Sequence, residues 1–169
     1  MKKINATVQL SVDNDLQNRQ QTWWVPHQKQ CQIWVQSALT FNKLKTFGLN
    51  DALIAIRFSD KQESAKLNEK HRNISNPTNV LAFPFLTEGW PEEGNFTPLG
   101  DLALCPEIIE SEALAQDKTE ENHWAHLLIH GTLHLCGYDH DNSSSRKLME
   151  EIETKTLKSL GIANPYLLV

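Results

Sequence analysis

Hydrophobic and polar positions alternate with two different periods near the start of the chain. Residues 4–12, INATVQLSV, alternate with a period of two, which predicts a β-strand with one buried face. Residues 28–47, QKQCQIWVQSALTFNKLKTF, place Trp34, Ala38 and Phe41 at helical spacing and contain no internal proline or glycine. The chain is therefore expected to begin with a strand and then a helix.

Three further apolar runs predict strands. Residues 52–58, ALIAIRF, lead into Asp60-x-x-Glu63, a capping-box pattern that predicts the start of a helix. Two shorter runs follow, NVLAFPF at 79–85 and LGDLALC at 99–105. The stretch LTEGWPEEGNFTPLG at 86–100 is rich in proline, glycine and acidic residues and predicts a surface loop between them. Pro84 indicates an edge or a distortion near the end of the first of these two strands.

The remainder of the chain is expected to be helical. One helix begins at Pro106, and another spans residues 120–136 before Gly137 ends it. A last helix covers residues 143–161, with serine caps at its start and inward positions that include Leu148, Ile152 and Leu160.

This order of elements predicts a single α+β domain over residues 1–169, with an α/β arrangement as the alternative. About four strands should form one small mixed sheet packed by helices. Strands joined by helices favour parallel pairing, and the closely spaced pair around the acidic loop favours a hairpin.

Composition narrows the class of protein. The chain is 40% hydrophobic and 22% charged, which is ordinary for a globular domain, and no stretch approaches the roughly 18 apolar residues of a membrane span. The amino terminus lacks the apolar segment of a secretory signal, so a cytoplasmic location without membrane contact is expected. The three cysteines form no CxxC pair and are expected to be reduced, buried thiols: Cys31, Cys105 and Cys136.

The net charge of −5 argues against a broadly basic surface, so any contact with nucleic acid must be local. The best basic candidate is the expected helix at 60–73, which carries Lys61, Lys66, Lys70, His71 and Arg72. The same segment carries the acidic residues Asp60, Glu63 and Glu69. A solvated helix face of mixed charge is therefore the favoured interpretation.

Candidate chemistry is concentrated in HGTLHLCGYDH, residues 130–140. His130 and His134 are four positions apart on a helix and can point two imidazoles at one ion. Gly137 permits a left-handed turn, after which His140 can return to the same point. Three imidazoles with an open fourth position are typical of a catalytic metal site.

Other side chains near this motif have simpler interpretations. His123 and His126 share the helical face and are alternative ligands, but lining the same cleft is the favoured interpretation. Asp139 and Asp141 can orient imidazole rings, although a turn and a cap of the last helix explain them equally well. Cys136 is rotated away from the ligand face and is expected in the core.

Gly131 stands where metalloproteases of the HExxH type carry their general base. Peptide hydrolysis by that route lacks its proton acceptor here. Phosphodiester hydrolysis depends less on such a base, because the metal and nearby cations stabilise charge on the phosphoryl oxygens, and it requires an arginine. We expect Gly131 to keep space and charge free for phosphate, so that Gly131→Glu would leave folding and metal binding intact but abolish cleavage of the phosphodiester substrate.

The chain resembles the YbeY family of bacterial endoribonucleases over residues 52–166, through HGTLHLCGYDH, RNISNPTNVLAFPF and LGDLALC. The resemblance implies a zinc-dependent, single-strand-specific endoribonuclease of the cytoplasm. It further implies a role in 3′-end maturation of the small-subunit 16S ribosomal RNA and in ribosome quality control, with precursor RNA and the small subunit as partners. It implies that one zinc ion is held by His130, His134 and His140, and that these ligands act in catalysis together with Arg72.

The sequence departs from the family pattern in two places. HRNISNPTNV lacks the Tyr-Arg-Gly start and the additional lysine that members often have, which reduces local positive charge, and Ala82 replaces a common serine. Two other functions remain as alternatives: a ribosome-assembly binding protein with a mainly structural metal, and a zinc peptidase without the usual glutamate. Three imidazoles also suit nickel, copper and iron.

Overall fold

The computed structural model describes residues 4–17, 23–41, 51–85 and 96–167. Four strands are present there, β1 Ala6–Val12, β2 Asp51–Phe58, β3 Val80–Pro84 and β4 Phe96–Leu104. The helices are α1 Asn14–Gln17, α2 Gln28–Phe41, α3 Lys61–Arg72, α4 Pro106–Ala115, α5 Glu120–Leu135 and α6 Ser143–Ser159. The predicted order of strands and helices is confirmed, and the short helix α1 was not predicted.

The four strands form one mixed sheet in the order β1-β2-β4-β3. Parallel pairs join β1 to β2 and β2 to β4, whereas β3 and β4 form the antiparallel pair. The α+β prediction, the mixed sheet and the hairpin are therefore confirmed. Pro84 is the last residue of the edge strand β3, where a missing N–H costs no ladder hydrogen bond.

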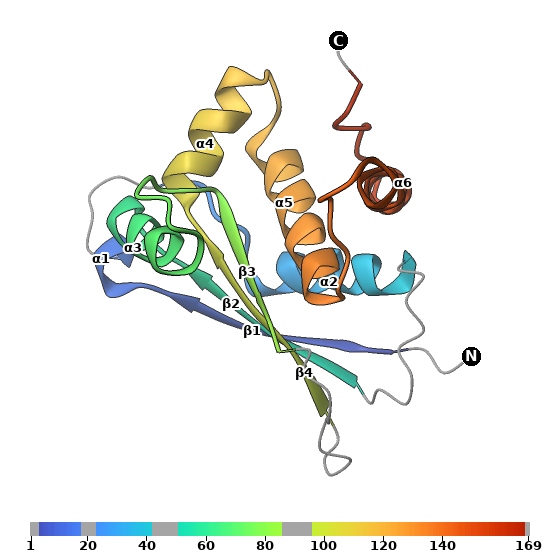
Figure 1. Cartoon of the computed structure of the whole chain (residues 1–169), viewed down its shortest axis with the longest axis horizontal. Coiled ribbons are helices and arrows are strands. Elements are labelled where there is room, and N and C mark those ends of the chain that lie inside the picture. The colour runs from blue at the N-terminus through green and yellow to red at the C-terminus, as the bar shows by residue number, and fades with distance from the viewer. Residues whose placement is uncertain (1–3, 18–22, 42–50, 86–95, 168–169) are drawn as a thin grey trace.

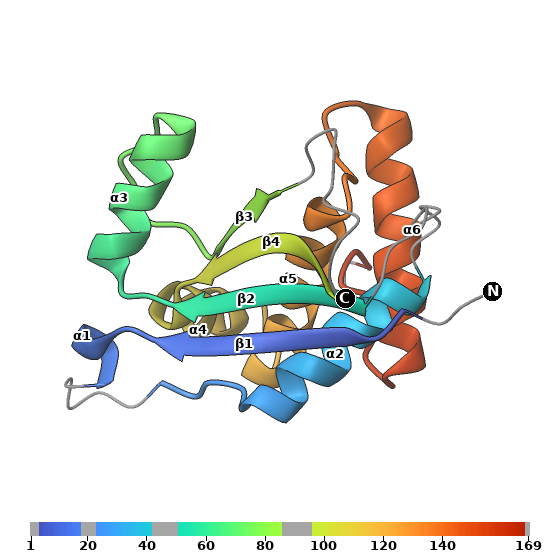
Figure 2. The same ribbon diagram turned by 90° about the horizontal axis from the view of Figure 1, so that it is seen from below.

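Helices α2 and α5 pack on one face of the sheet, with α6 behind them (Figures 1 and 2). The ring of Trp124 on α5 meets that of Phe58 on β2 edge to face, with 4.9 Å between the ring centroids. Both side chains are fully buried, and they lie in one core with the inward residues of the sheet and of α5: Ile54, Ile56, Leu102, Leu104, Leu128, Ile129 and Leu133. Burial of this apolar layer fixes α5 against the sheet.

The helix termini follow capping rules, with one correction. The side chain of Asp60 caps α3 by accepting from the Glu63 backbone N–H at 2.8 Å, as the capping-box pattern predicted. The expected serine cap of α6 is wrong: Asn142 is the N-cap, and Ser145 completes a capping box with it. Asparagine and serine are both strong caps, so composition alone did not decide between neighbouring positions.

One predicted inward position is wrong. Leu148 is 37% exposed and lies one position before the buried Met149, and Phe41, on the helical face of Trp34 and Ala38, is 39% exposed at the end of α2. The stripe of α2 ends with Ala38 and Leu39, and that of α6 contains Met149 and Ile152. Residues 42–47 of the first expected helix lie outside the described residues, as does most of the acidic loop.

The three cysteines are buried thiols, as predicted. Burial raises the pKa of Cys31 and Cys136 to about 12, so these thiols stay protonated at neutral pH. Within the residues that the structure describes, no helix has the length and apolarity that crossing a membrane requires.

Candidate metal centre

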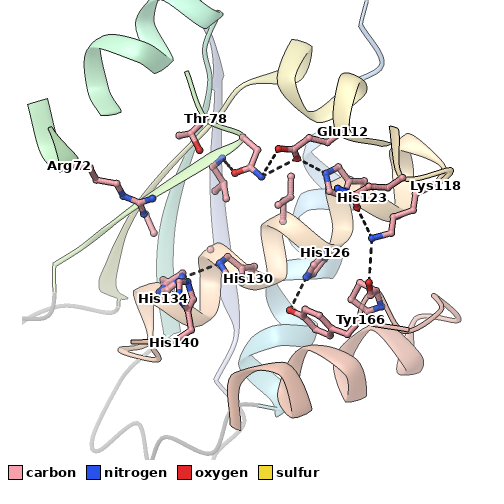
Figure 3. A pocket seen from close by; sticks show the side chains of 17 residues that line it. Arg72, Thr78, Glu112, Lys118, His123, His126, His130, His134, His140 and Tyr166 are labelled. Carbon is pink, nitrogen blue, oxygen red and sulfur yellow. Dashed lines mark hydrogen bonds and ion pairs between the residues drawn. The ribbon is translucent and has the colours of Figure 1, made fainter. Parts of the chain in front are cut away.

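Helix α5 and the turn after it bring three histidines together (Figure 3). His130 and His134 lie on successive turns of α5, and their Nε2 atoms are 3.1 Å apart. Gly137, at φ 86°, reverses the chain so that His140 returns to the pair. The centroid of its ring lies 5.6 Å from that of His130 and 5.1 Å from that of His134. The structure thus brings together all three predicted ligands.

The cluster has the dimensions of a metal site. One candidate ligand atom from each ring lies within 4.8 Å of the other two. Three nitrogens at about 2.1 Å from a tetrahedral ion are separated by roughly 3.4 Å, so small ring movements suffice to hold one ion. Burial, followed by the neighbouring His130 and His140, lowers the pKa of His134 to about 4. His134 is therefore neutral at neutral pH and retains a lone pair for a metal.

Hydrogen bonds at the outer nitrogens set the orientation of two rings. His134 Nδ1 donates to the backbone oxygen of Tyr138 at 2.9 Å, and His130 Nδ1 donates to Glu153 Oε1 at 2.5 Å. Donation from Nδ1 leaves the Nε2 lone pairs facing one another. The Gly137 turn therefore has two consequences. It returns His140 to the cluster, and it presents the Tyr138 carbonyl to His134.

Glu153 is the functional candidate that sequence reasoning missed. It lies on α6 and is fully buried, next to Ile152 and one helical turn from Met149. A glutamate within the apolar stripe of a helix was the available signal, because a buried carboxylate requires hydrogen-bond partners. Burial alone would raise the pKa of Glu153, but hydrogen bonds with His126 and His130 outweigh it and lower the pKa to about 2. The carboxylate is ionised at neutral pH.

His126 and Tyr166 complete the surroundings of this carboxylate. The Tyr166 hydroxyl donates to Glu153 Oε2 and lies 3.2 Å from His126 Nε2. His126, His130 and Glu153 form a second group with donor atoms close enough for a metal. The 2.5 Å between His130 Nδ1 and the carboxylate is a hydrogen bond, however, and is too short for two ligands of one ion. We interpret this group as a hydrogen-bond network behind the three-histidine cluster.

The cluster opens into a cleft of about 420 Å³, which we call the α5 cleft (Figure 3). Arg72, the last residue of α3, lines the same cleft. His123 and His126 also line it, as predicted, and His123 Nε2 bonds Glu112 at 2.7 Å. The cleft thus combines the proposed ligands with the proposed functional arginine.

The remaining sequence candidates take ordinary structural roles. Asp139 accepts from the backbone N–H of His140 at 2.6 Å, which supports its interpretation as a turn residue. Asp141 precedes the true cap of α6 and is not itself the cap. On α3, Lys66 and Lys70 are exposed and Lys61 pairs with Glu107 at 2.7 Å, so a mixed-charge face describes this helix except at Arg72.

The structure changes the expectation for Gly131. The residue is buried, and a Cβ added to it would lie 2.8 Å from Leu102 Cδ2 and 3.3 Å from Val80 Cγ2. Leu102 is itself buried in the core, so it cannot move without disturbing its neighbours. These contacts argue against the expectation that folding would be unaffected by Gly131→Glu, because the position lies in the close packing of α5 on the sheet.

The fold and the cleft together define a class of protein, a small α+β domain that presents three convergent imidazoles and an arginine in one cleft. The chain belongs to the endoribonuclease YbeY family, whose family model matches residues 15–161. This match extends further toward the amino terminus than the resemblance recognised over residues 52–166. The family assigns the chain to the hydrolases that cut RNA internally.

A solved structure supports the fold. The chain is similar to the solution structure of TM1509 from Thermotoga maritima, with 20% sequence identity and a TM-score of 0.54. The alignment covers 92% of this chain and 92% of that chain. At this identity the similarity concerns the fold alone.

We predict that Gly131→Ala lowers the free energy of unfolding, because overpacking in a filled core typically costs about 1–3 kcal/mol. Helix propensity opposes this loss by only about 1 kcal/mol. Gly131→Glu should destabilise more, since it also places a charge against Val80 and Leu102. Urea unfolding of both variants measures the effect.

A double-mutant cycle identifies the cause. In a Leu102→Ala background the Leu102 methyl that the new Cβ would meet at 2.8 Å is absent, so Gly131→Ala should cost clearly less there than in the wild type. Additive losses in the cycle would show that contact with Leu102 does not explain the glycine.

Proposed function

We propose that this protein is a metal-dependent endoribonuclease that cleaves single-stranded regions of ribosomal RNA precursors, with 3′-end maturation of 16S RNA as its reaction. The observation that supports this most directly is the convergence of His130, His134 and His140 in the cleft that also contains Arg72. Zinc is the proposed ion, one per chain, since it accepts three neutral imidazoles with an open fourth position.

The chain's own groups contribute positioning and charge. When bound, the ion supplies a Lewis acid and lowers the pKa of coordinated water. Glu153 and the Tyr138 carbonyl hold two of the rings. Arg72 has no carboxylate partner among the described residues, so its guanidinium is available for a phosphate through paired hydrogen bonds.

The peptidase alternative is disfavoured because, among the described residues, no carboxylate of the cleft stands where a protease carries its base. Position 131 has no side chain, and a Cβ added there would lie 2.8 Å from Leu102 Cδ2. Of the described residues that line the cleft, Glu112 is the only carboxylate, and it accepts hydrogen bonds from Asn79 and His123. A protease base in the usual place is therefore missing, whereas a phosphodiester substrate is served by the cations of the cleft.

Cellular placement is part of the same proposal. A reaction on ribosomal precursors requires that the enzyme meets the small ribosomal subunit in the cytoplasm. With a net charge of −5, the protein must attract RNA through local cations or through the surface of that subunit. The proposal includes a role in ribosome quality control, because cleavage of RNA in defective ribosomal particles would use the same site.

The central experiment compares the wild type with His134→Ala. The wild type should contain about one divalent ion per chain by elemental analysis and should cut a ribosomal RNA precursor but not casein. His134→Ala should lose the ion and the cleavage, yet remain folded and still bind RNA. If the variant instead unfolds and loses ribosome association together, the binding-protein alternative with a structural metal is correct. Metal retained at unchanged affinity would refute the ligand assignment.

We predict that Glu153→Gln weakens metal affinity about 10–100-fold, the usual effect of removing the carboxylate partner of a metal-binding histidine. The amide keeps the shape of the side chain but loses the charge that holds the His130 proton. Chelator competition measures the affinity, with the exposed Glu151→Gln on the same helix as control. Equal affinities in both variants would show that Glu153 serves folding alone.

We predict that Arg72→Ala and Arg72→Lys both depress RNA cleavage at least tenfold while metal content and Tm stay near wild type. Lysine keeps the charge but cannot reproduce the paired hydrogen bonds to a phosphate. Lys66→Ala, an exposed cation of the same helix outside the cleft, is the matched control and should leave cleavage unchanged. Full activity of Arg72→Lys would contradict a bidentate role.

A further inference from the structure

A second cation lines the α5 cleft away from the three histidines. Lys118 lies in the turn between α4 and α5, directly before the Thr119 cap of α5, and is partly buried. Its Nζ lies 2.8 Å from Gln116 Oε1 and 3.5 Å from the backbone oxygen of Pro165. Both partners are neutral, and over the part of the chain that the structure describes no carboxylate lies within ion-pair distance of Lys118.

This environment differs from that of other cations near the surface. Arg57 is paired with Asp13 at 2.6 Å, and Lys61 with Glu107 at 2.7 Å. The nearest acidic side chain that lines the cleft with Lys118 is Glu112, whose oxygens are already engaged by Asn79 and His123. The charge of Lys118 is therefore uncompensated, and its position in a partly enclosed cleft strengthens its attraction for an anion.

An exposed aromatic ring lies beside this cation. Tyr166 lines the same cleft and is 41% exposed, although its hydroxyl is fixed by Glu153 and lies 3.2 Å from His126. Pro165, which accepts from Lys118, is its neighbour in the chain. Proteins that bind single-stranded nucleic acids combine aromatic rings, on which bases stack, with cations that bind phosphates. Tyr166 and Lys118 offer this combination.

Arg72 and Lys118 line the cleft near different ends of α5 (Figure 3). Arg72 lies on the side of His134 and His140, whereas Lys118 lies near the end that begins with His123. The eleven positions between His123 and His134 correspond to about 16 Å along a helix axis. An anion at Lys118 is therefore a different group from the phosphate beside the three histidines.

We propose that Lys118 and Tyr166 form a second nucleotide subsite, in which Lys118 binds a backbone phosphate and Tyr166 stacks with a base. This inference rests on the proposed function and adds that the substrate is held at two points, so a single-stranded oligonucleotide is preferred over a dinucleotide. The first phosphate contact lies at the histidines and Arg72, and the second lies at Lys118, near the His123 end of the α5 cleft.

Binding to an uncleavable RNA tests the subsite without depending on activity. Metal-loaded wild type, Lys118→Gln and the exposed control Lys66→Gln are titrated with a fluorescent 2′-O-methyl single-stranded oligonucleotide at several salt concentrations. Lys118→Gln should raise the Kd about tenfold and should reduce the slope of log Kd against log salt by about one phosphate contact. Lys66→Gln should leave both near wild type. Equal values for all three proteins, or equal losses in both variants, would overturn the proposal.

The aromatic contact has its own pair of variants. Tyr166→Phe keeps the ring but removes the hydroxyl that bonds Glu153, whereas Tyr166→Leu removes the ring. Both variants lack the hydroxyl, so the leucine variant should bind the oligonucleotide about tenfold more weakly than the phenylalanine variant, in the range for one stacked base. Equal Kd values for the two variants would refute stacking. Cleavage of the matched unmodified RNA by wild type tests the proposed function separately, since the binding arms do not require it.

Discussion

The arrangement of the whole cleft depends on how closely α5 approaches the sheet. Trp124 and Leu128 on α5 pack against the strands, and Gly131 continues this inward face at a point where even a Cβ would meet Leu102. The same helix carries the histidines that line the cleft. A bulkier residue at 131 would move the helix outward, and the rings of His130 and His134 would move with it.

A buried charge links this helix to the last one. Glu153 is ionised in the core, which is costly unless hydrogen bonds compensate, and here His130 and Tyr166 supply them. The carboxylate thus ties α6 and the segment after it to the histidine cluster on α5. With a cation at the cluster the negative charge would gain a further favourable interaction, so the network and the proposed metal support one another.

Local patterns predicted the elements well, and long-range contacts could not be predicted. The periods of two and 3.6 located the strands and helices, and HxxxHxxGxxH placed three histidines because a helix and one turn suffice to bring them together. Leu148 was assigned wrongly because a period does not fix its phase to within one residue. Lys118 and Tyr166 come from segments far apart in the chain, and only the tertiary fold places them at one cleft, with Glu153 bonded to Tyr166 behind it.

The missing base of the histidine motif has a physical cause within the fold. In HExxH sites the residue after the first ligand carries the proton acceptor. Here the side chain at that position would start in contact with Leu102 and Val80, inside the packing between α5 and the sheet. Substrate charge is therefore not the only reason for glycine at position 131, because a side chain there would begin inside this packing. Any proton acceptor in the reaction must come from another element or from the RNA, and Arg72 and Lys118 in the same cleft suit a phosphate better than a peptide.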